Sequence, residues 1–244
     1  MAETVAGKMS PATDFKSGTQ AGISIGIGYF PIALTFGLLA KSAGLSFGET
    51  VMMSLIVFAG ASQYISLSLL SLGTGMFEIV LTTFIVNIRH FLMATSLNEK
   101  APEGDTAAKA VYSFGLTDET FSVAATKDGE VRPGYMFGLV LISYSSWVIF
   151  SGAGHLVGAN LPKTLQESMA VALYAMFIGL LVPSMKKSAK AIYLAVMAAA
   201  FNTIFTLGKV LEAGWAIVAA TLLAAVIAET VVFVKERKVA GGEK

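Results

Sequence analysis

The sequence contains no cysteine, only two histidines and few charged residues. Without cysteine, the chain forms neither disulfides nor thiolate metal sites. Its two histidines, His90 and His155, are too few to suggest a transition-metal centre, so we expect no metal and no other cofactor. Charged residues make up 14% of the chain, whereas about 25% is usual in soluble domains. A net charge of +1 gives no indication of nucleic acid binding.

The chain has long uncharged apolar runs instead. Hydrophobic residues make up 55% of it, and the mean hydropathy is +0.71. A helix that crosses a bilayer needs about 20 mostly apolar residues. We therefore predict an all-α fold, a polytopic integral membrane helical bundle in contact with the lipid bilayer. The runs without Asp, Glu, Lys or Arg are 17–40, 50–77, 133–162, 168–185, 191–208 and 213–228.

The number of spans depends on residues 107–126, because Asp118 and Glu119 lie near the centre of this segment. If the segment crosses, there are eight spans, and one side holds eleven Lys and Arg residues against five on the other. Cytoplasmic loops carry the excess of Lys and Arg, so this bias favours eight spans with both termini cytoplasmic. Seven spans, or a re-entrant segment, are the alternatives. The other expected spans are 20–40, 49–72, 76–97, 134–155, 166–184, 190–208 and 211–234.

These spans leave no room for a separate soluble domain. We expect a cytoplasmic N-terminal tail over 1–16, a single transmembrane domain over 17–234 and a cytoplasmic C-terminal tail over 235–244.

The first span contains helix-breaking residues in its middle. Gly26 and Gly28 precede Pro31, which removes a backbone donor and clashes with the preceding turn. Many transporters place such a discontinuous helix beside a substrate cavity. We predict that the first helix is broken and lines a cavity; a kinked but continuous helix is the alternative.

The second span contains "FAGASQ", residues 58–63. Its small residues allow close approach between membrane helices, and packing alone accounts for them. Packing does not account for Gln63, an amide within an apolar run. We include Ser62 and Gln63 among the candidate substrate-binding residues.

The stretch "FIVNIRHFLMATS", residues 84–96, places polar groups inside a third span. An unpaired Arg89 there costs about 2.5–3.5 kcal/mol, and an ion pair with Asp118 or Glu119 would offset this cost. Asn87 and His90 are three residues apart and share a helix face, while Arg89 points elsewhere. Snorkelling of Arg89 to the membrane surface, and a purely structural hydrogen bond of His90, are the alternatives.

This set of polar groups suits a zwitterionic substrate. Arg89, or unwound N–H groups, could hold a carboxylate, and the acids Asp118 and Glu119 could hold an ammonium group or a proton. Thr117 precedes these acids and completes the candidate set. No nucleophile–base triad, Walker loop or metal cluster is present, so the sequence gives no support for an enzyme.

Four motifs resemble the AzlC-type branched-chain amino-acid permease family: "GYFPIALTFGLLAKSAGLS", "FAGASQY", "VNIRHFLMATSL" and "FGLTDETFSVA". The resemblance covers residues 18–183. It implies the large subunit of a two-component exporter of leucine, valine, isoleucine and sometimes methionine in a prokaryotic cell membrane. It also implies proton coupling and a small AzlD-type membrane subunit. An intramembrane enzyme that uses Asp118, Glu119 and His90, or a channel or scaffold, remains the alternative.

Overall fold

The fold of the described residues is entirely helical. The structure is a computed structural model that describes residues 11–158, 188–211 and 213–241, with isolated positions 164, 178, 181–182 and 185–186 between them. Within these residues, four helices are long and apolar enough to cross a membrane, which confirms the predicted helical membrane bundle. The expected span over 166–184 falls almost wholly outside the described residues.

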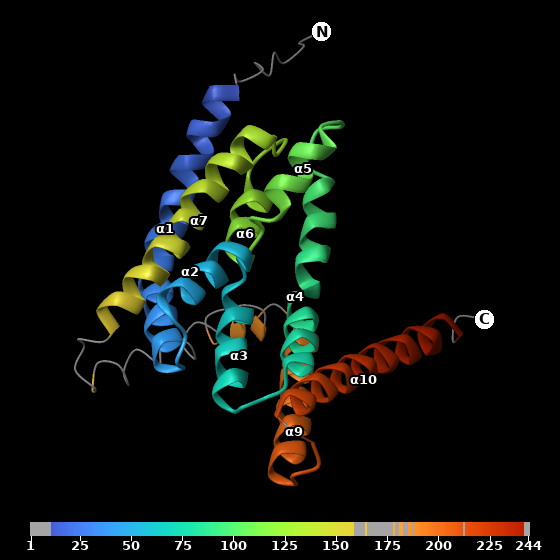
Figure 1. Cartoon of the computed structure of the whole chain (residues 1–244). Helices are drawn as coiled ribbons and strands as arrows, with labels where there is room; N and C mark the ends of the chain where they lie inside the picture. The colour runs from blue at the N-terminus through green and yellow to red at the C-terminus, as the bar shows by residue number, and fades with distance from the viewer. Residues whose placement is uncertain are drawn as a thin grey trace. The chain divides into compact units, whose positions relative to one another are not determined.

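The chain divides into two compact units, residues 1–63 with 87–172 and residues 64–86 with 173–244. The first unit contains most of the predicted site, and the helices labelled α1, α2, α5, α6 and α7 in Figure 1 belong to it. Its helices are α1 (Pro11–Ser42), α2 (Phe47–Ile56), α5 (Thr106–Ser113), α6 (Asp118–Thr126) and α7 (Pro133–Gly158), with the first residues of α3 (Gly60–Ser71) and the second half of α4 (Met76–Asn98).

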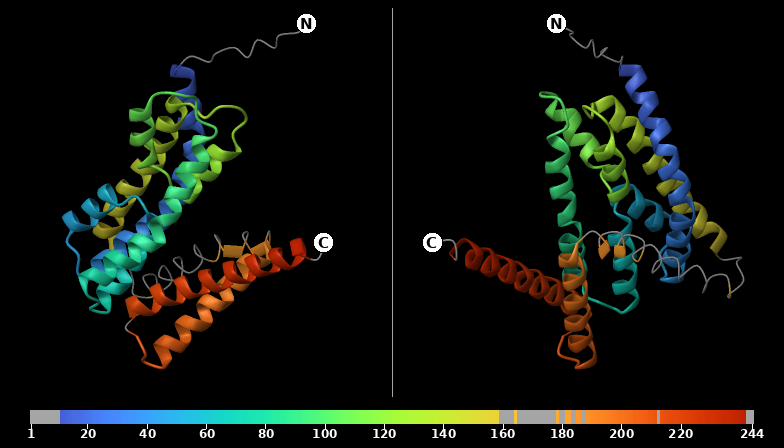
Figure 2. Two further views of the ribbon diagram at one scale, coloured as in Figure 1. Left: turned by 90° about the vertical axis from the view of Figure 1, so that its right-hand side faces the viewer. Right: turned by 180° about the vertical axis from the view of Figure 1, so that it is seen from behind.

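Helices α1 and α7 pack side by side along their lengths and run in parallel (Figures 1 and 2). A Cβ atom on Gly18 would collide with the carbonyl oxygen of Tyr135, and one on Gly37 would collide with that of Ser151. From the other side, a Cβ atom on Gly154 would collide with a backbone carbonyl of α1. The two backbones therefore touch where glycine replaces a side chain, as is usual between membrane helices.

The predicted break in the first helix is wrong, because α1 is one continuous helix from Pro11 to Ser42. Pro31 lies inside it, and the hydroxyl of Thr35 donates to the Pro31 carbonyl at 2.8 Å. The Gly26 carbonyl accepts a hydrogen bond from Ser146 of α7 at 2.7 Å. Packing against α7 and these hydroxyl bonds keep the segment helical despite its glycines and proline.

The predicted span over 49–72 is not one helix, because the chain leaves helical geometry at residues 57–59, between α2 and α3. Val57 has φ −115° and ψ 82°. The Tyr144 hydroxyl donates to the Leu55 carbonyl at 2.7 Å and so occupies an acceptor at the end of α2. At the start of α3, a Cβ atom on Gly60 would lie 2.8 Å from the Trp147 ring, so the close packing of this turn requires glycine.

Residues 107–126 enter the bundle and return to the same end, which corresponds to the re-entrant alternative. The segment consists of two short helices, α5 and α6, with a break over 114–117. Lys100, just before α5, donates from Nζ to the carbonyls of Ala125 and Lys127, just after α6, at 2.6 and 3.0 Å. Val131 N–H also donates to the Lys100 carbonyl at 2.8 Å.

The same contacts give the direction of α4. Its last residue, Asn98, lies at the end of the unit where α7 begins, and that end also holds Asp14 of α1, 3.6 Å from Arg132. Helix α4 is therefore antiparallel to α1, whereas eight regular crossings would make the two parallel. The chain between the end of α1 and the start of α4 must therefore begin and end on the same side of the membrane. Helices α2 and α3 have 10 and 12 residues, about 15 and 18 Å, so neither crosses a core of about 30 Å.

The second unit contains α9 (Ala189–Leu207) and α10 (Ala213–Gly241), which pack against each other. Lys190 and Glu229 form an ion pair at 2.6 Å between them. The rings of Phe77 and Trp215 lie 6.2 Å apart within this unit.

Candidate functional site

The two helix breaks of the first unit meet at a cluster of aromatic rings. Phe58, in the break between α2 and α3, has its ring 5.2 Å from that of Tyr144. Phe114, in the break between α5 and α6, has its ring 5.9 Å from the same tyrosine. Tyr29 of α1 packs edge-on against Phe58 at 6.2 Å and against Trp147 at 5.2 Å. Side chains of α1 and α7 therefore hold both breaks together.

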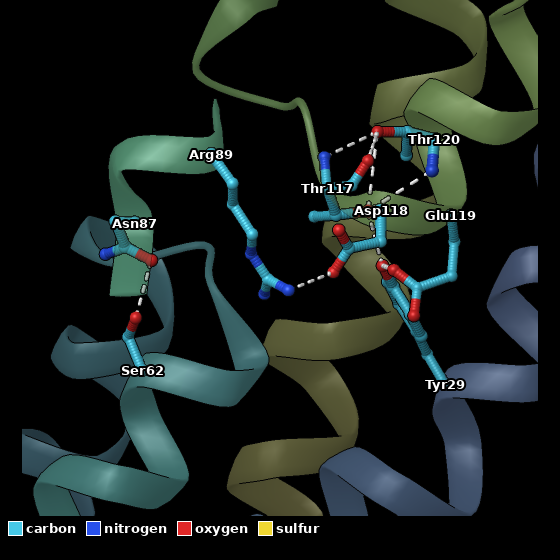
Figure 3. Close-up of polar contacts among 8 residues, drawn as sticks. All are labelled: Tyr29, Ser62, Asn87, Arg89, Thr117, Asp118, Glu119 and Thr120. Atoms are coloured by element: carbon cyan, nitrogen blue, oxygen red, sulfur yellow. Dashed lines mark hydrogen bonds and ion pairs between the residues drawn. The ribbon is translucent and has the colours of Figure 1, made fainter. Parts of the chain in front are cut away.

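Arg89 was predicted to pair with Asp118 or Glu119, and the structure pairs it with Asp118 at this level of the bundle. Arg89 Nη1 lies 2.9 Å from Asp118 Oδ2, and the two side chains are 35% and 28% exposed. Figure 3 shows Arg89 extending from α4 toward the first turn of α6. Measured from the helix ends at Asn98 and Thr126, they lie about 13 and 12 Å deep. Both charges are therefore near mid-membrane depth, where an ion pair offsets their burial cost.

Glu119, the next residue, has a different environment. The Tyr29 hydroxyl donates to Glu119 Oε2 at 2.7 Å and lies 2.7 Å from Thr117 Oγ1 (Figure 3). Thr117 also forms the N-cap of α6, because its side chain accepts from Thr120 N–H and its own N–H donates to Thr120 Oγ1. One hydroxyl of α1 thus connects the cap of α6 to the second acid.

Gln63 is fully buried in the first turn of α3, and its amide has partners on both sides. Its Oε1 accepts from the Trp147 indole N–H at 2.6 Å, and its Nε2 donates to Ser54 Oγ at 3.3 Å. The amide therefore connects the helices on either side of the break to α7. This hydrogen bonding explains why a polar side chain occurs in the apolar run.

Ser62 and Asn87 form a second polar contact between α3 and α4. The Ser62 hydroxyl donates to Asn87 Oδ1, and Figure 3 shows this pair on the opposite side of Arg89 from Asp118. Among the described residues, His90 makes no hydrogen bond in the structure, although it faces the electrostatic field of Arg89 and Glu119.

Gly26 and Gly28, the two glycines predicted to line a cavity from the first helix, have different surroundings. A Cβ atom on Gly26 would lie 3.3 Å from the Ile142 side chain, so this position is in the contact with α7. Gly28 is exposed and would meet nothing within 4 Å. Neither of them, nor Pro31, is hydrogen-bonded to the polar groups around Arg89 among the described contacts.

Sequence reasoning missed three residues of the site, Tyr29, Tyr144 and Trp147. Each presents a large ring with a polar tip inside an apolar run, and such tips find a partner when they are buried. Tyr29 directly precedes the "FP" of the first span, so a buried polar tip in the same motif as Pro31 was the available signal.

The described side chains do not form a metal site, since no group of three or more His, Cys, Asp and Glu residues gathers among them. They offer an ion pair, a second acid held by a hydroxyl, the buried amide of Gln63, the half-buried amide of Asn87 and aromatic walls. Such a set can bind opposite charges and an apolar group, and it can accept a proton.

Comparison with known proteins identifies the family. The family model described as AzlC protein matches residues 24–161. This range covers more than half of the chain and includes both helix breaks and the polar groups between them. The chain belongs to the AzlC family. Its resemblance to this family, drawn from the four motifs, is thereby confirmed.

Several relatives cover most of the chain. The inner membrane protein YgaZ of Escherichia coli is 33% identical over 71% of this chain and 74% of its own length. An uncharacterized membrane protein of Archaeoglobus fulgidus is 31% identical over 73% of this chain and 79% of its own length. The branched-chain amino acid transport protein AzlC of Bacillus subtilis is 26% identical over 72% and 70%. No solved structure matches the chain.

Proposed function

We propose that this AzlC-family protein is a secondary transporter that exports branched-chain amino acids, leucine, valine and isoleucine, with methionine as a further substrate. The observation that carries the proposal is the Arg89–Asp118 pair beside two helix breaks at mid-membrane depth. Discontinuous helices at the midplane are a common way for transporters to build a substrate site. The name of the Bacillus subtilis relative supports the substrate class.

The polar groups around the breaks match the two charges of an amino acid. The first N–H groups of α3, from Gly60 to Ser62, have no carbonyl partner within their helix. Together with Arg89, they offer donors to the substrate carboxylate. Asp118 offers an acceptor to the ammonium group, and the rings of Phe58 and Tyr144 offer apolar surface to the aliphatic side chain. Ser62, Gln63, Asn87, His90 and Thr117 complete the proposed substrate-binding set.

The same electrostatics support proton coupling. A substrate that binds between Arg89 and Asp118 competes with their mutual attraction, so the pair opens and closes during a transport cycle. Asp118 and Glu119 are the candidate proton-coupling acids. When the substrate carboxylate binds Arg89, the arginine attracts nearby acids less strongly, and an acid with less cationic charge around it binds protons more tightly. Substrate and proton binding become linked in this way.

Charge distribution supports a cytoplasmic N-terminal end for the first unit. The end that holds the start of α1 carries five described Lys and Arg residues, whereas the opposite end carries Lys41. The positive-inside rule then orients α5 and α6 as a hairpin that enters from the cytoplasm. We place the protein in a prokaryotic cell membrane with a cytoplasmic C-terminus as well. The five residues are Lys16, Lys100, Lys109, Lys127 and Arg132.

The experiment is counterflow of labelled leucine into proteoliposomes loaded with unlabelled leucine. We expect counterflow of labelled leucine. Unlabelled valine and isoleucine should inhibit it by competition, and a small AzlD-type subunit should increase its rate. Arg89→Gln should reduce it strongly, whereas Lys190→Gln, which breaks the exposed pair with Glu229, should not. A wild-type protein that gives no counterflow with the subunit present would contradict the proposal. Transport unaffected by collapse of the pH gradient would remove proton coupling alone.

A further inference from the structure

Asp118 and Glu119 are consecutive acids with different partners. Asp118 Oδ2 is 2.9 Å from Arg89 Nη1, whereas Glu119 Oε2 accepts a hydrogen bond from the Tyr29 hydroxyl at 2.7 Å. The ion pairs found among the described residues do not include Glu119. One acid is thus neutralised by a cation, and the other is held by a neutral hydroxyl.

From this difference we infer that Glu119 is the group that takes up the transported proton, while Asp118 stays ionised as the partner of Arg89. The inference rests on the proposed transport function and gives the two acids separate roles. It also makes Tyr29 and Thr117 positioning residues, because they affect proton binding only through their hydrogen bonds to Glu119 and to each other.

The hydroxyl chain can accept either protonation state of Glu119. When Glu119 is ionised, the Thr117 hydroxyl donates to the Tyr29 oxygen, and the Tyr29 hydroxyl donates to Glu119. When a proton binds to Glu119, its O–H donates to the Tyr29 oxygen, and the Tyr29 O–H turns to Thr117. The Thr117 proton then turns to Thr120 Oγ1, 3.4 Å away. All three hydroxyl protons stay on their own oxygens, and the bound proton is the only one gained.

The reversal links the proton to the helix break. Thr117 Oγ1 accepts from Thr120 N–H at 3.2 Å and thereby caps α6. In the protonated state, Thr117 Oγ1 accepts hydrogen bonds from both Thr120 N–H and the Tyr29 hydroxyl. It then no longer donates a hydrogen bond to Tyr29 of α1. Protonation of Glu119 therefore changes the hydrogen bond that joins α1 to the α6 cap, and it does so at the break itself.

The charged surroundings agree with this assignment. Helix α4 contributes Arg89, which Asp118 holds, and His90, which lies within electrostatic range of Glu119. Helix α1 contributes the neutral Tyr29 hydroxyl. Helix α7, residues 133–158, contains no Asp, Glu, Lys or Arg. A proton that neutralises Glu119 consequently leaves the Arg89–Asp118 charge balance intact.

The test is an infrared titration of the purified full-length protein, which records the C=O stretch of protonated carboxyl groups as the pH is lowered. We expect Glu119→Gln to remove the band that titrates at the highest pH, and Asp118→Asn to retain it. Tyr29→Phe removes a donor to the ionised form, so the midpoint of this band should move to higher pH by about tenfold in proton affinity. Tyr144→Phe is the matched control and should not move the band, because within the described part of the chain the Tyr144 hydroxyl bonds to the Leu55 carbonyl and not to Glu119.

Loss of the band in Asp118→Asn, with retention in Glu119→Gln, would overturn the inference. If Glu119→Gln does not fold, the Tyr29→Phe titration decides, and an unmoved midpoint would overturn it. Absence of leucine counterflow by the wild type would contradict the proposed function, but the infrared result would still identify the proton-binding acid. If counterflow is present, the response of transport to a pH gradient should be lost in Glu119→Gln.

Discussion

Neutralising Arg89 should destabilise the fold mainly through Asp118. The two charges are joined at 2.9 Å, with side chains about a third exposed. At about 4 Å between charge centres and an effective dielectric constant of about 20, their attraction is roughly 4 kcal/mol. Desolvation of both groups opposes this attraction. We expect a net coupling of about 2 kcal/mol, which is roughly thirty-fold in an equilibrium constant.

A double-mutant cycle measures this coupling directly. The free energy of unfolding in detergent micelles would be determined for the wild type, Arg89→Gln, Asp118→Asn and the double variant. Each single change strands one charge, so the double variant should lose about 2 kcal/mol less than the sum of the singles. It should assemble better than either single variant without regaining proton-coupled transport.

Two further cycles serve as controls. Arg89 with Glu119 should show a coupling below about 0.5 kcal/mol, because these side chains form no ion pair in the structure. Lys190 with Glu229, which is exposed although its atoms lie 2.6 Å apart, should show about 0.5 kcal/mol. Equal coupling of Arg89 to both acids, or none to Asp118, would refute the reasoning and favour a snorkelling arginine.

Two other predictions follow from the backbone arrangement. Gly37→Ala places a methyl group against α7 and should lower the stability of the protein by about 1–3 kcal/mol, measured by thermal unfolding. Gly28→Ala is the control, because its methyl group meets open space and should not lower the stability. Equal melting temperatures of the two variants would contradict the α1–α7 contact. Because the chain has no native cysteine, a single introduced cysteine reports which side of the membrane its position faces. Glu103→Cys and Asp128→Cys should react with an impermeant maleimide from one side of the membrane, and Ser42→Cys from the other. Labelling of Glu103→Cys and Asp128→Cys from opposite sides would exclude the re-entrant α5–α6 segment.

The sequence was sufficient to predict the membrane class, the main long helices and an ion pair of Arg89 with one of the two acids, Asp118 or Glu119. These depend on the cost of charge in an apolar environment, which acts on any chain in a bilayer. The helix breaks were misplaced because local propensity identified Pro31, whereas the contact with α7 keeps α1 helical and Trp147 packs against the start of α3. Such tertiary packing has no signature within a single span.

The direction of α4 could not be predicted for a related reason. Hydropathy gives the same result for a segment that crosses and for two short helices that return, such as α5 and α6. Tertiary contacts distinguish the two cases, such as those of Lys100 with the carbonyls of Ala125 and Lys127. Tyr29 was missed because its partners, Thr117 and Glu119, lie some ninety residues further along the chain.

The parallel α1–α7 pair has a consequence for how the protein is made. Helix α1 leaves the ribosome first, and its glycine face has no partner until α7 follows about ninety residues later. Meanwhile the α5–α6 segment, which carries two acids, is too short to be released into lipid as a spanning helix. Its acids obtain their partners only when α1, α4 and α6 assemble. Nascent chains that end before Pro133 still lack the partner of the α1 glycine face, so synthesis of α7 is the step that allows the first unit to close.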